Sequence, residues 1–365
     1  MILMNGFLRE PEDLRDRELQ AVARVLRSGW YVLGKEVEAF ETEWARATGT
    51  AHAVGVGNGM DAIEIGLRAL GIGPGDEVIS TPMTAFATVL AVLRAGAQPV
   101  LADIDASTAL LSMNSVRRCL TPRTRAVLLV HLYGHAVALQ PWRRFCDESG
   151  VLLVEDCAQA HLASSDGVRA GAAGAVGAFS FYPTKNLGAA GDGGALTTGD
   201  DAVAAKARQL RNYGQSVRYH HPELGMNSRL DELQAAILRV RLGVLESFTE
   251  RKKAIARAYR QGIENPRVRL LAAPTQPQSH VYHLFVVLCE ERDRLSEHLK
   301  ARGIETLIHY PLPVHRQPPC RDLPRDPLGL PFAEKHGDTC LSIPCHPQLT
   351  DGEVSTVIQA LNDFR

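Results

Sequence analysis

The 365-residue sequence lacks several features that assign a protein to a special class. Its seven cysteines are odd in number and none belongs to a Cys-x-x-Cys pair, so we expect reduced thiols and no disulfide framework. No apolar run approaches the ~18 residues that a membrane helix needs. The N-terminal segment lacks the apolar core and cleavage site of a signal peptide. These absences predict a cytoplasmic protein with no membrane segment.

An excess of charge of either sign is also missing. The formal net charge is −1, which argues against a protein that binds nucleic acid through bulk charge. There is no internal repeat and no low-complexity tract. The remaining composition is ordinary for a globular protein, with 45% hydrophobic and 22% charged residues. The length predicts one large domain together with a smaller one.

Up to about residue 200, apolar strands alternate with helix-like segments. The strands look apolar on both faces, which is typical of a mainly parallel sheet covered by helices. Strands are expected within 51–59, 73–80, 98–104, 121–134, 151–160, 177–182 and 193–199. Helices are expected over 12–27, with Asp13 as a possible cap, and over 60–71, 84–95 and 141–149.

After residue 200 this alternation weakens. Residues 229–260 predict one or two long helices, and the segments from 279 to 310 predict a small β/α domain with a helix over 291–302. The proline-rich stretch 309–331 is expected to be an ordered surface loop. We therefore divide the chain into a large domain, 1–245, and a small C-terminal domain, 246–365.

Ligands of open parallel sheets collect beyond the carboxyl ends of the strands, so the residues that follow each strand are informative. Gly57-Asn58-Gly59 follows the strand at 53–56 and precedes a helix. Such a turn can bind a phosphate through free backbone amides, although a simple tight turn has the same pattern. Glu155 and Asp156 follow another strand, where a carboxylate could bind a ribose, a metal or a cationic ring nitrogen, or could cap a helix.

The third strand end carries a lone lysine. Lys185 follows Pro183 and Thr184 and opens a glycine-rich loop, while Ser180 lies on the same strand face as Tyr182. Taken alone, Lys185 fits a solvated turn. Together with a phosphate turn and a carboxylate, however, it matches what pyridoxal phosphate requires. The amine would form a Schiff base and move protons, and the carboxylate would keep the pyridine nitrogen protonated.

These motifs resemble the sugar aminotransferases of the DegT/DnrJ/EryC1/StrS family, over nearly the whole chain. The resemblance implies the α/β aspartate aminotransferase fold (fold type I), with a mainly parallel seven-stranded sheet and a smaller C-terminal α/β domain. It is carried by "SGWYVLGKEVEAFE" (28–41), "GVGNGMDAIEIGLRALGIGPGDEVI" (55–79), "VEDCAQAHLA" (154–163), "FSFYPTKNLGAAGDGGAL" (179–196), "RNYGQ" (211–215) and "GMNSRLDELQAAILRVRL" (225–242).

The resemblance also implies roles for individual residues. Lys185 corresponds to the Schiff-base lysine, Asp156 to the partner of the pyridine nitrogen, and Gln159 to the residue that contacts the ring hydroxyl. The remaining positions are Gly59, Met60 and Asp61 in the phosphate turn, Ser180 as a phosphate-binding hydroxyl, Asn227 reaching the phosphate of the neighbouring subunit, and Arg229, His309 and Tyr310 on the substrate side. The family is dimeric, so a homodimer with shared active sites is expected.

One position departs from the family pattern. Many members have a ring-stacking aromatic directly after the residue that corresponds to Thr84, whereas this chain has Ala85, and we expect Phe86 to stack instead. The retained Lys185 disfavours the family's dehydratase branch, in which histidine replaces it. The motif "GNGMDA" resembles members that aminate C3 of a dTDP- or UDP-linked keto hexose with L-glutamate as donor, and C4 amination is the alternative.

Other functions remain as alternatives. Histidines in "HLYGH" (131–135) and "HVYH" (280–283) invite a metal site, but both segments are strand-like, so no metal is expected. The basic and aromatic segment 208–221 could be a solvated loop, a nucleotide-sugar contact or a nucleic-acid patch. A nicotinamide oxidoreductase using Gly57–Gly59 would lack an evident ribose-binding acid. A catalytically silent binding protein on the same fold is the last alternative.

Overall fold

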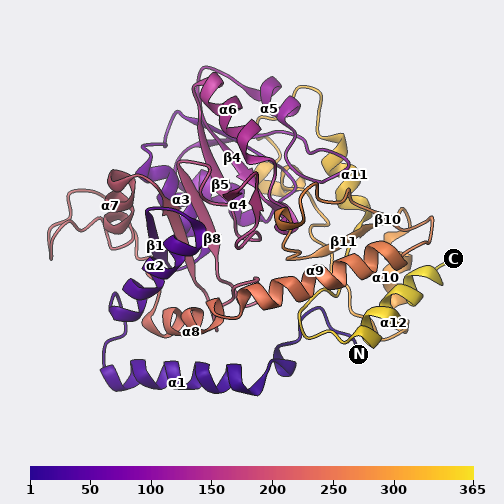
Figure 1. Ribbon diagram of the computed structural model, residues 1–365. Coiled ribbons are helices and arrows are strands. Elements are labelled where there is room, and N and C mark those ends of the chain that lie inside the picture. Colours follow the sequence, from indigo (N-terminus) through magenta and orange to yellow (C-terminus); the bar gives the residue numbers. More distant parts are fainter.

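The large domain is built on one seven-stranded sheet covered by helices. A computed structural model describes all residues, 1–365 (Figure 1). The strand order is β1-β9-β8-β5-β4-β2-β3, and only β9 runs antiparallel to its neighbours. The strands are β1 (His52–Val56), β2 (Glu77–Ser80), β3 (Gln98–Leu101), β4 (Thr124–Val130), β5 (Leu152–Asp156), β8 (Val176–Ser180) and β9 (Gly194–Thr198). The mainly parallel seven-stranded sheet expected from the sequence is confirmed.

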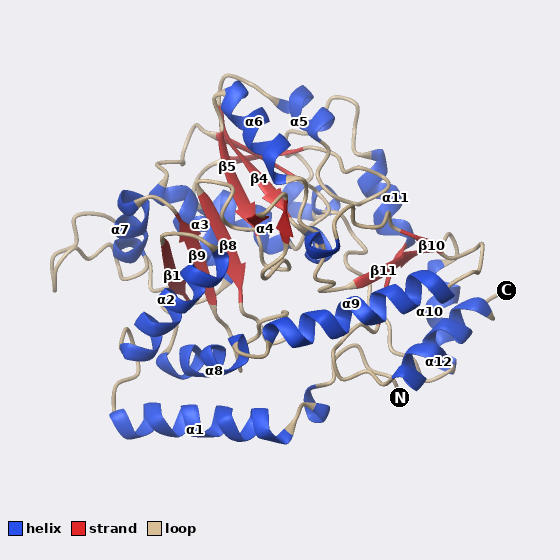
Figure 2. Ribbon diagram, in the orientation of Figure 1, coloured by secondary structure: helices blue, strands red, loops and turns tan.

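Helices cover both faces of this sheet (Figure 2). Successive side chains of a strand point to opposite faces, and the two faces belong to different apolar clusters. In β5, Val154 packs with the cluster of α3 (Gly59–Ala69), α4 (Phe86–Arg94) and α7 (Asp201–Leu210). Leu153 packs with the cluster of α5 (Met113–Cys119) and α6 (Leu139–Ser149). Near β1, β8 and β9, the face opposite α3 is covered by α2 (Lys35–Thr48) and α8 (Glu232–Leu242). Because both faces of the sheet are buried, the sequences of its strands are nearly continuous apolar runs.

The helices of the large domain follow the expected order. They are α1 (Glu12–Ser28), α2 (Lys35–Thr48), α3 (Gly59–Ala69), α4 (Phe86–Arg94), α5 (Met113–Cys119), α6 (Leu139–Ser149), α7 (Asp201–Leu210) and α8 (Glu232–Leu242). Asp13 is not the cap of α1, because Pro11 occupies that position and Asp13 lies within the first turn. Proline needs no amide partner there, which explains why it can precede the helix directly.

The C-terminal part forms a second, smaller layer. A three-stranded antiparallel sheet, β10 (Arg269–Leu270), β11 (Phe285–Leu288) and β12 (Cys340–Ile343), packs with α9 (Leu245–Gly262), α10 (Arg292–Ala301) and α12 (Asp351–Asn362). Helix α11 (Pro331–Thr339) precedes β12. Ile2 joins this cluster and pairs with Ile304, so the N-terminus lies beside the C-terminal layer (Figure 1). The division at residue 245 remains a proposal.

The structure refines several local expectations. Of the one or two helices expected over 229–260 it has two, α8 and α9, which are separated at Gly243 and Val244. The strand expected within 121–134 is β4, which ends at Val130, and residues 132–134 form a 3-10 turn. A short hairpin, β6 (Ser164–Ser165) and β7 (Val168–Arg169), was not expected. No helix has both the length and the hydropathy needed to span a bilayer.

Candidate active site

The glycine turn after β1 lies directly against the end of β8. A Cβ atom on Gly59 would stand 2.6 Å from the Cβ of Ser180, so only glycine permits this approach. Asn58 caps α3 by accepting a hydrogen bond from the Asp61 amide at 2.9 Å. The first amides of a helix have no intrahelical partner. The cap therefore uses the Asp61 amide and leaves those of Gly59 and Met60 without a partner, with Gly59 packed against Ser180.

The Asp61 side chain holds this turn in place. Its buried carboxylate accepts hydrogen bonds from Asn58 Nδ2 at 3.0 Å and from Ser228 Oγ at 2.7 Å. Ser228 Oγ in turn accepts from the Gly57 amide at 2.9 Å. The carboxylate thus connects the turn to the segment that contains Asn227. Neither Asn58 nor Ser228 was singled out from the sequence as a site residue.

Asp156 ends β5 as a buried carboxylate with two protein partners. Oδ1 accepts from the Ala158 amide at 3.0 Å, as a turn-capping aspartate would. Oδ2 accepts from the Thr88 hydroxyl at 2.8 Å, and Thr88 Oγ1 lies 2.8 Å from Thr84 Oγ1. Because Thr88 donates its only hydroxyl proton to the carboxylate, Thr84 must donate to Thr88. The carboxylate is therefore held by a one-way chain of hydroxyls, which the sequence did not indicate.

The Gln159 side chain bridges two parts of the chain. Its Oε1 accepts from the Tyr133 amide at 2.6 Å, and its Nε2 donates to the Tyr310 hydroxyl at 3.2 Å. Burial raises the pKa of Tyr310 to about 12, and the negative charge of Asp156 acts in the same direction. Tyr310 therefore remains a neutral phenol at physiological pH. Phe86 is the first residue of α4 and packs half-buried against the adjoining apolar cluster.

Lys185 follows a tight turn after β8. Its backbone amide donates to the Tyr182 carbonyl at 2.8 Å. The glycine loop is closely packed, because a Cβ atom on Gly188 would lie 2.3 Å from the Pro183 oxygen. Burial lowers the pKa of Lys185 to about 8, and the negative charge of Asp156 opposes part of that shift. The neutral, nucleophilic form of this amine is therefore more populated near physiological pH than that of an ordinary lysine.

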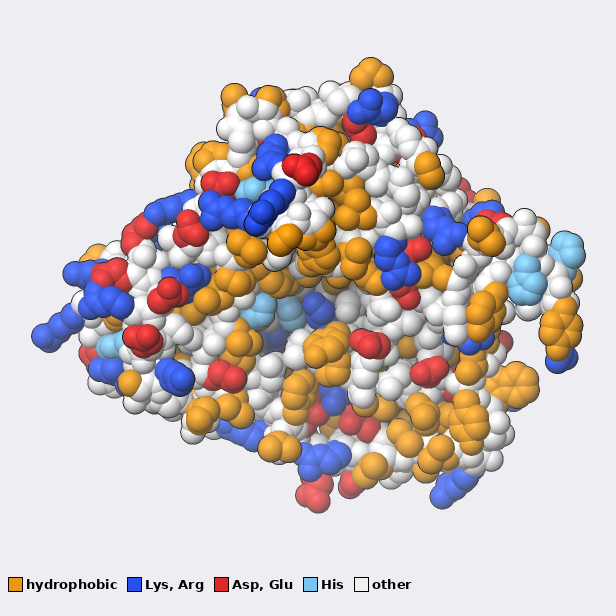
Figure 3. Space-filling view, turned by 180° about the vertical axis from the view of Figure 1, so that it is seen from behind, with side chains coloured by type: hydrophobic (Ala, Val, Ile, Leu, Met, Phe, Trp, Pro, Cys, Tyr) orange, Lys and Arg blue, Asp and Glu red, His pale blue; other side chains and the backbone are white.

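These groups fit pyridoxal phosphate chemically. The Lys185 amine makes no hydrogen bond or ion pair within the protein, so it is available for a carbonyl carbon. The Asp156 carboxylate keeps lone pairs beyond those used by Thr88 and Ala158, which suits a cationic ring nitrogen. Two helix N-terminal amides and a hydroxyl suit a phosphate. Figure 3 shows the molecule from behind, with a hollow in which histidine and lysine or arginine side chains are exposed.

The predicted substrate-side residues divide into two groups. His309 precedes Tyr310, and its Nδ1 lies 2.8 Å from Ser342 Oγ. Burial and the nearby charge of Lys185 lower the pKa of His309 to about 4, so its ring is neutral. Asn227 is exposed, and Arg229 donates to Asn212 Oδ1 at 3.2 Å. Neither Asn227 nor Arg229 has a hydrogen bond or ion pair to Lys185 within the single chain.

The histidines weighed as metal ligands have other partners. His131 Nε2 lies 2.9 Å from Glu155 Oε2, and Cys157 offers a third ligand atom in the same cluster. The Glu155 carboxylate also accepts hydrogen bonds from the amides of residues 171, 173 and 174. A carboxylate with this many donors is already satisfied, which favours a structural role for this cluster. His135 stacks on His280 with ring centroids 4.9 Å apart, a contact that the sequence did not predict.

Comparison with known proteins identifies the family. The model of the DegT/DnrJ/EryC1/StrS aminotransferase family matches residues 12–362. The chain belongs to this family. It is therefore a sugar aminotransferase that works with pyridoxal phosphate. The expected fold type I architecture is confirmed by the same match together with the sheet order.

Individual relatives agree over almost the full length. A protein named dTDP-3-amino-3,4,6-trideoxy-alpha-D-glucose transaminase from Streptomyces venezuelae is 48% identical over 97% of this chain and 93% of its own. The erythromycin biosynthesis sensory transduction protein EryC1 of Saccharopolyspora erythraea is 46% identical over 96% of this chain and 95% of its own. The crystal structure of S. venezuelae DesV in complex with a ketimine intermediate superposes with a TM-score of 0.94 and 46% identity. It covers 100% of this chain and 97% of that one.

Proposed function

We propose that this chain is a homodimeric aminotransferase that transfers the amino group of L-glutamate to C3 of a nucleotide-linked keto sugar. The observation that carries the proposal is the placement of Lys185, an unpaired amine with a lowered pKa. It lies in the turn that follows β8, and β8 pairs with β5, the strand that ends in Asp156. The name of the S. venezuelae transaminase, a dTDP-3-amino sugar enzyme, supports the choice of C3.

Each residue of the site has a task in this proposal. Pyridoxal phosphate, when bound, supplies a carbonyl carbon for amine exchange and a ring that withdraws electrons from the reacting carbon. Lys185 holds the cofactor covalently between turnovers and carries a proton while it is released. Asp156, oriented by Thr88, would pair with the ring nitrogen. The amides of Gly59 and Met60 and the hydroxyl of Ser180 bind the phosphate.

The substrate-side residues hold neutral groups next to the reacting carbon. His309 has a lowered pKa and Tyr310 a raised one, so both are uncharged over the working pH range. Neutral hydrogen-bonding groups suit the hydroxyls of a sugar ring. These hydroxyls carry no charge, so a charged side chain beside them would have no ionic partner. Gln159 bonds the Tyr310 hydroxyl at 3.2 Å and so couples the position of the substrate to that of the cofactor.

A second subunit is required to complete the proposed site. Asn227 and Arg229 do not contact Lys185 within one chain, and we propose that they act on the neighbouring subunit's cofactor and substrate. Exposed aromatic side chains lie nearby in the sequence, including Tyr213 with 46% and Tyr219 with 80% of its surface accessible. Exposed large apolar side chains that lie close together are typical of protein interfaces.

The proposal is tested by following the two half-reactions separately. Purified protein loaded with pyridoxal phosphate is mixed with L-glutamate, and the visible absorbance of the cofactor should shift to that of the amine form. The reverse half-reaction uses dTDP- or UDP-linked 3-amino and 4-amino sugars with the cofactor in its aldehyde form. Conversion of the 3-amino sugars alone is expected. Preference for 4-amino sugars would overturn the C3 assignment, and Asn227→Ala should impair both half-reactions if the site is shared.

The alternative of a catalytically silent protein on the same fold disagrees with the activity that the family match assigns. The name of the S. erythraea relative, a sensory transduction protein, is the observation that favours it. Against it stands the complete set of Lys185, Asp156, Gln159 and Ser180. A loaded protein whose spectrum does not respond to L-glutamate or to any nucleotide-linked amino sugar would support the silent alternative.

A further inference from the structure

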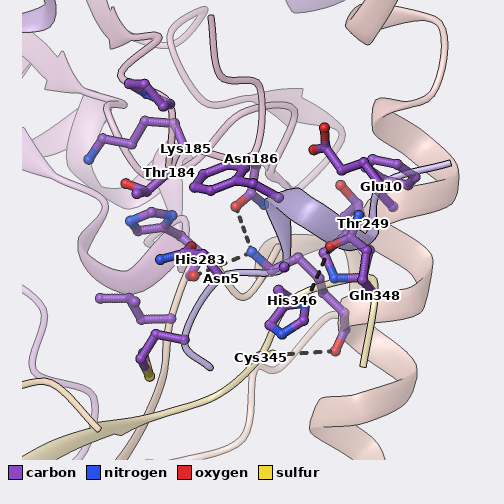
Figure 4. Close-up of a pocket in the computed structure, with 18 of the residues that line it drawn as sticks. Asn5, Glu10, Thr184, Lys185, Asn186, Thr249, His283, Cys345, His346 and Gln348 are labelled. Atoms are coloured by element: carbon purple, nitrogen blue, oxygen red, sulfur yellow. Dashed lines mark hydrogen bonds between the residues drawn. The ribbon is translucent and has the colours of Figure 1, made fainter. Parts of the chain in front are cut away.

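A cavity extends from Lys185 and His309 away from the cofactor residues. It is enclosed by the lysine loop, by one side of α9, by the N-terminal segment and by the chain around His346 (Figure 4). Asp156, Gln159 and Ser180 do not line it. The cavity therefore adjoins the reacting lysine without being the cofactor pocket.

Lys252 of α9 places a buried positive charge in this cavity. Only 7% of its surface is accessible, and its Nζ donates to Asn186 Oδ1 at 3.0 Å and to the His283 carbonyl at 3.3 Å. Both acceptors are neutral, and Lys252 forms no salt bridge. Buried lysines are normally paired with a carboxylate, because removing an ammonium from water without a counter-charge is costly.

No acidic side chain in the cavity is free to serve as the counter-charge of Lys252. The one carboxylate among its lining residues is Glu10, which already forms a bidentate pair with Arg241 at 3.1 and 2.7 Å. Burial lowers the pKa of Lys252 to about 8, so the ammonium form still prevails at neutral pH. The positive charge of this cavity is thus left for a ligand to balance.

Other polar groups around Lys252 also lack partners. The Nδ1 atom of His283 is buried and makes no hydrogen bond. Thr249, one turn before Lys252 on α9, is buried and its hydroxyl has no protein partner. The half-buried side-chain amide of Asn5 has no protein partner either. An imidazole nitrogen, a hydroxyl, an amide and an ammonium can all donate to an anionic oxygen.

We propose that this cavity is an oxyanion subsite, with Lys252 as its charged residue and Thr249 as a neutral donor, for an acidic group of one of the two substrates. The inference rests on the proposed function for the identity of those substrates. The acidic group is a carboxylate of the amino-acid donor or the diphosphate of the nucleotide sugar, both of which present anionic oxygens. Lys185 lines the same cavity, which suits an anion that belongs to a molecule bound at the reacting centre.

Direct binding tests the subsite without relying on turnover. The probes are glutarate for the dicarboxylate and thymidine diphosphate for the diphosphate, titrated calorimetrically into the protein loaded with pyridoxal phosphate. The variants are Lys252→Met, Lys252→Arg and Thr249→Val, with Lys253→Met as the matched control on the next position of the same helix. We expect at least one probe to bind roughly tenfold or more weakly to Lys252→Met, as for the loss of a hydrogen bond to a charged group, with Lys252→Arg and Lys253→Met close to the parent.

Thr249→Val separates ligand binding from a purely structural role of Lys252. It leaves the Lys252–Asn186 hydrogen bond intact, so the cofactor absorbance and the thermal midpoint should not change while the same probe binds more weakly. Weakened glutarate binding assigns the subsite to the donor, and weakened thymidine diphosphate binding assigns it to the nucleotide sugar. If both probes bind Lys252→Met and Thr249→Val as they bind the parent, the subsite is refuted, even where both half-reactions proceed.

Discussion

Replacement of Thr88 by valine isolates the hydroxyl chain that holds Asp156. Valine has nearly the same shape, so the change removes one hydroxyl without opening a cavity. Thr88 is buried, and its loss leaves Asp156 Oδ2 without a donor and Thr84 Oγ1 without an acceptor. A hydrogen bond to a charged group contributes ~1.5–3 kcal/mol, and we expect the apoprotein to lose about that much stability.

The same loss should appear in the reaction. In the proposed function Asp156 pairs with the ring nitrogen, and a carboxylate held by the Ala158 amide alone would do so less well. A loss of ~1.4 kcal/mol in the transition state corresponds to a tenfold slower half-reaction. The assays are urea denaturation of the apoprotein and stopped-flow absorbance of the loaded enzyme with L-glutamate. Thr88→Ser, which keeps the hydroxyl, is the matched control. It should retain most of the stability of the apoprotein and most of the rate of the half-reaction.

A double substitution tests whether the two threonines act as one chain. Thr84→Val alone should cost less than Thr88→Val, because it removes a bond between two neutral hydroxyls. The double variant should cost less than the sum of the single variants, since Thr84 has no acceptor once Thr88 is valine. If Thr88→Val is as stable and as fast as the parent, or if Thr88→Ser is equally impaired, the argument that this chain orients Asp156 is wrong.

The remaining predictions concern the lysine, the phosphate turn and the buried acid. Lys185→Ala should fold normally but show no visible absorbance shift with L-glutamate, and a retained shift would exclude it as the reacting amine. Burial lowers the pKa of Lys185 to about 8, so the rate at which pyridoxal phosphate attaches to the apoprotein should rise as the pH passes about 8 and then level off. Stopped-flow absorbance measures this rate, and a rate that does not change across this range would contradict the lowered pKa. Gly59→Ala should raise the Kd for pyridoxal phosphate roughly tenfold, because its Cβ would stand 2.6 Å from that of Ser180, while Gly199→Ala, which meets open space, should bind as the parent does. Glu155→Gln should destabilise the apoprotein by ~3–5 kcal/mol in urea denaturation, because it breaks a fully buried pair with His131, and an unchanged midpoint would show that the pair is dispensable.

The sequence predicted those parts of the site that lie next to a strand end. Lys185 and Asp156 follow apolar strands, and the carboxyl ends of parallel strands meet at one edge of a sheet, so their proximity could be anticipated. Thr88 and Ser228 were not anticipated. Thr88 reaches Asp156 across 68 positions and Ser228 reaches Asp61 across 167, so only the folded chain brings these partners together.

Short sequence patterns did not predict the role of a residue where a neighbouring residue or a tertiary contact determined it. Asp13 has the chemistry of a helix cap, but the helix begins one position earlier, at Glu12, and its N-cap is Pro11. Asp61 was expected to offer its amide to a phosphate, and that amide is used by the Asn58 cap. The break between α8 and α9 occurs at Gly243, which an amphipathic pattern alone does not place.

The central claim is that the Lys185 amine carries the cofactor, and peptide mapping tests it most directly. The loaded protein is reduced with borohydride, digested and analysed by mass spectrometry for the lysine that bears the pyridoxyl phosphate group. Lys252, the other buried lysine of the adjoining cavity, serves as the internal comparison. Modification confined to Lys185 is the predicted result, and modification of Lys252 or release of the cofactor unreduced would contradict the account.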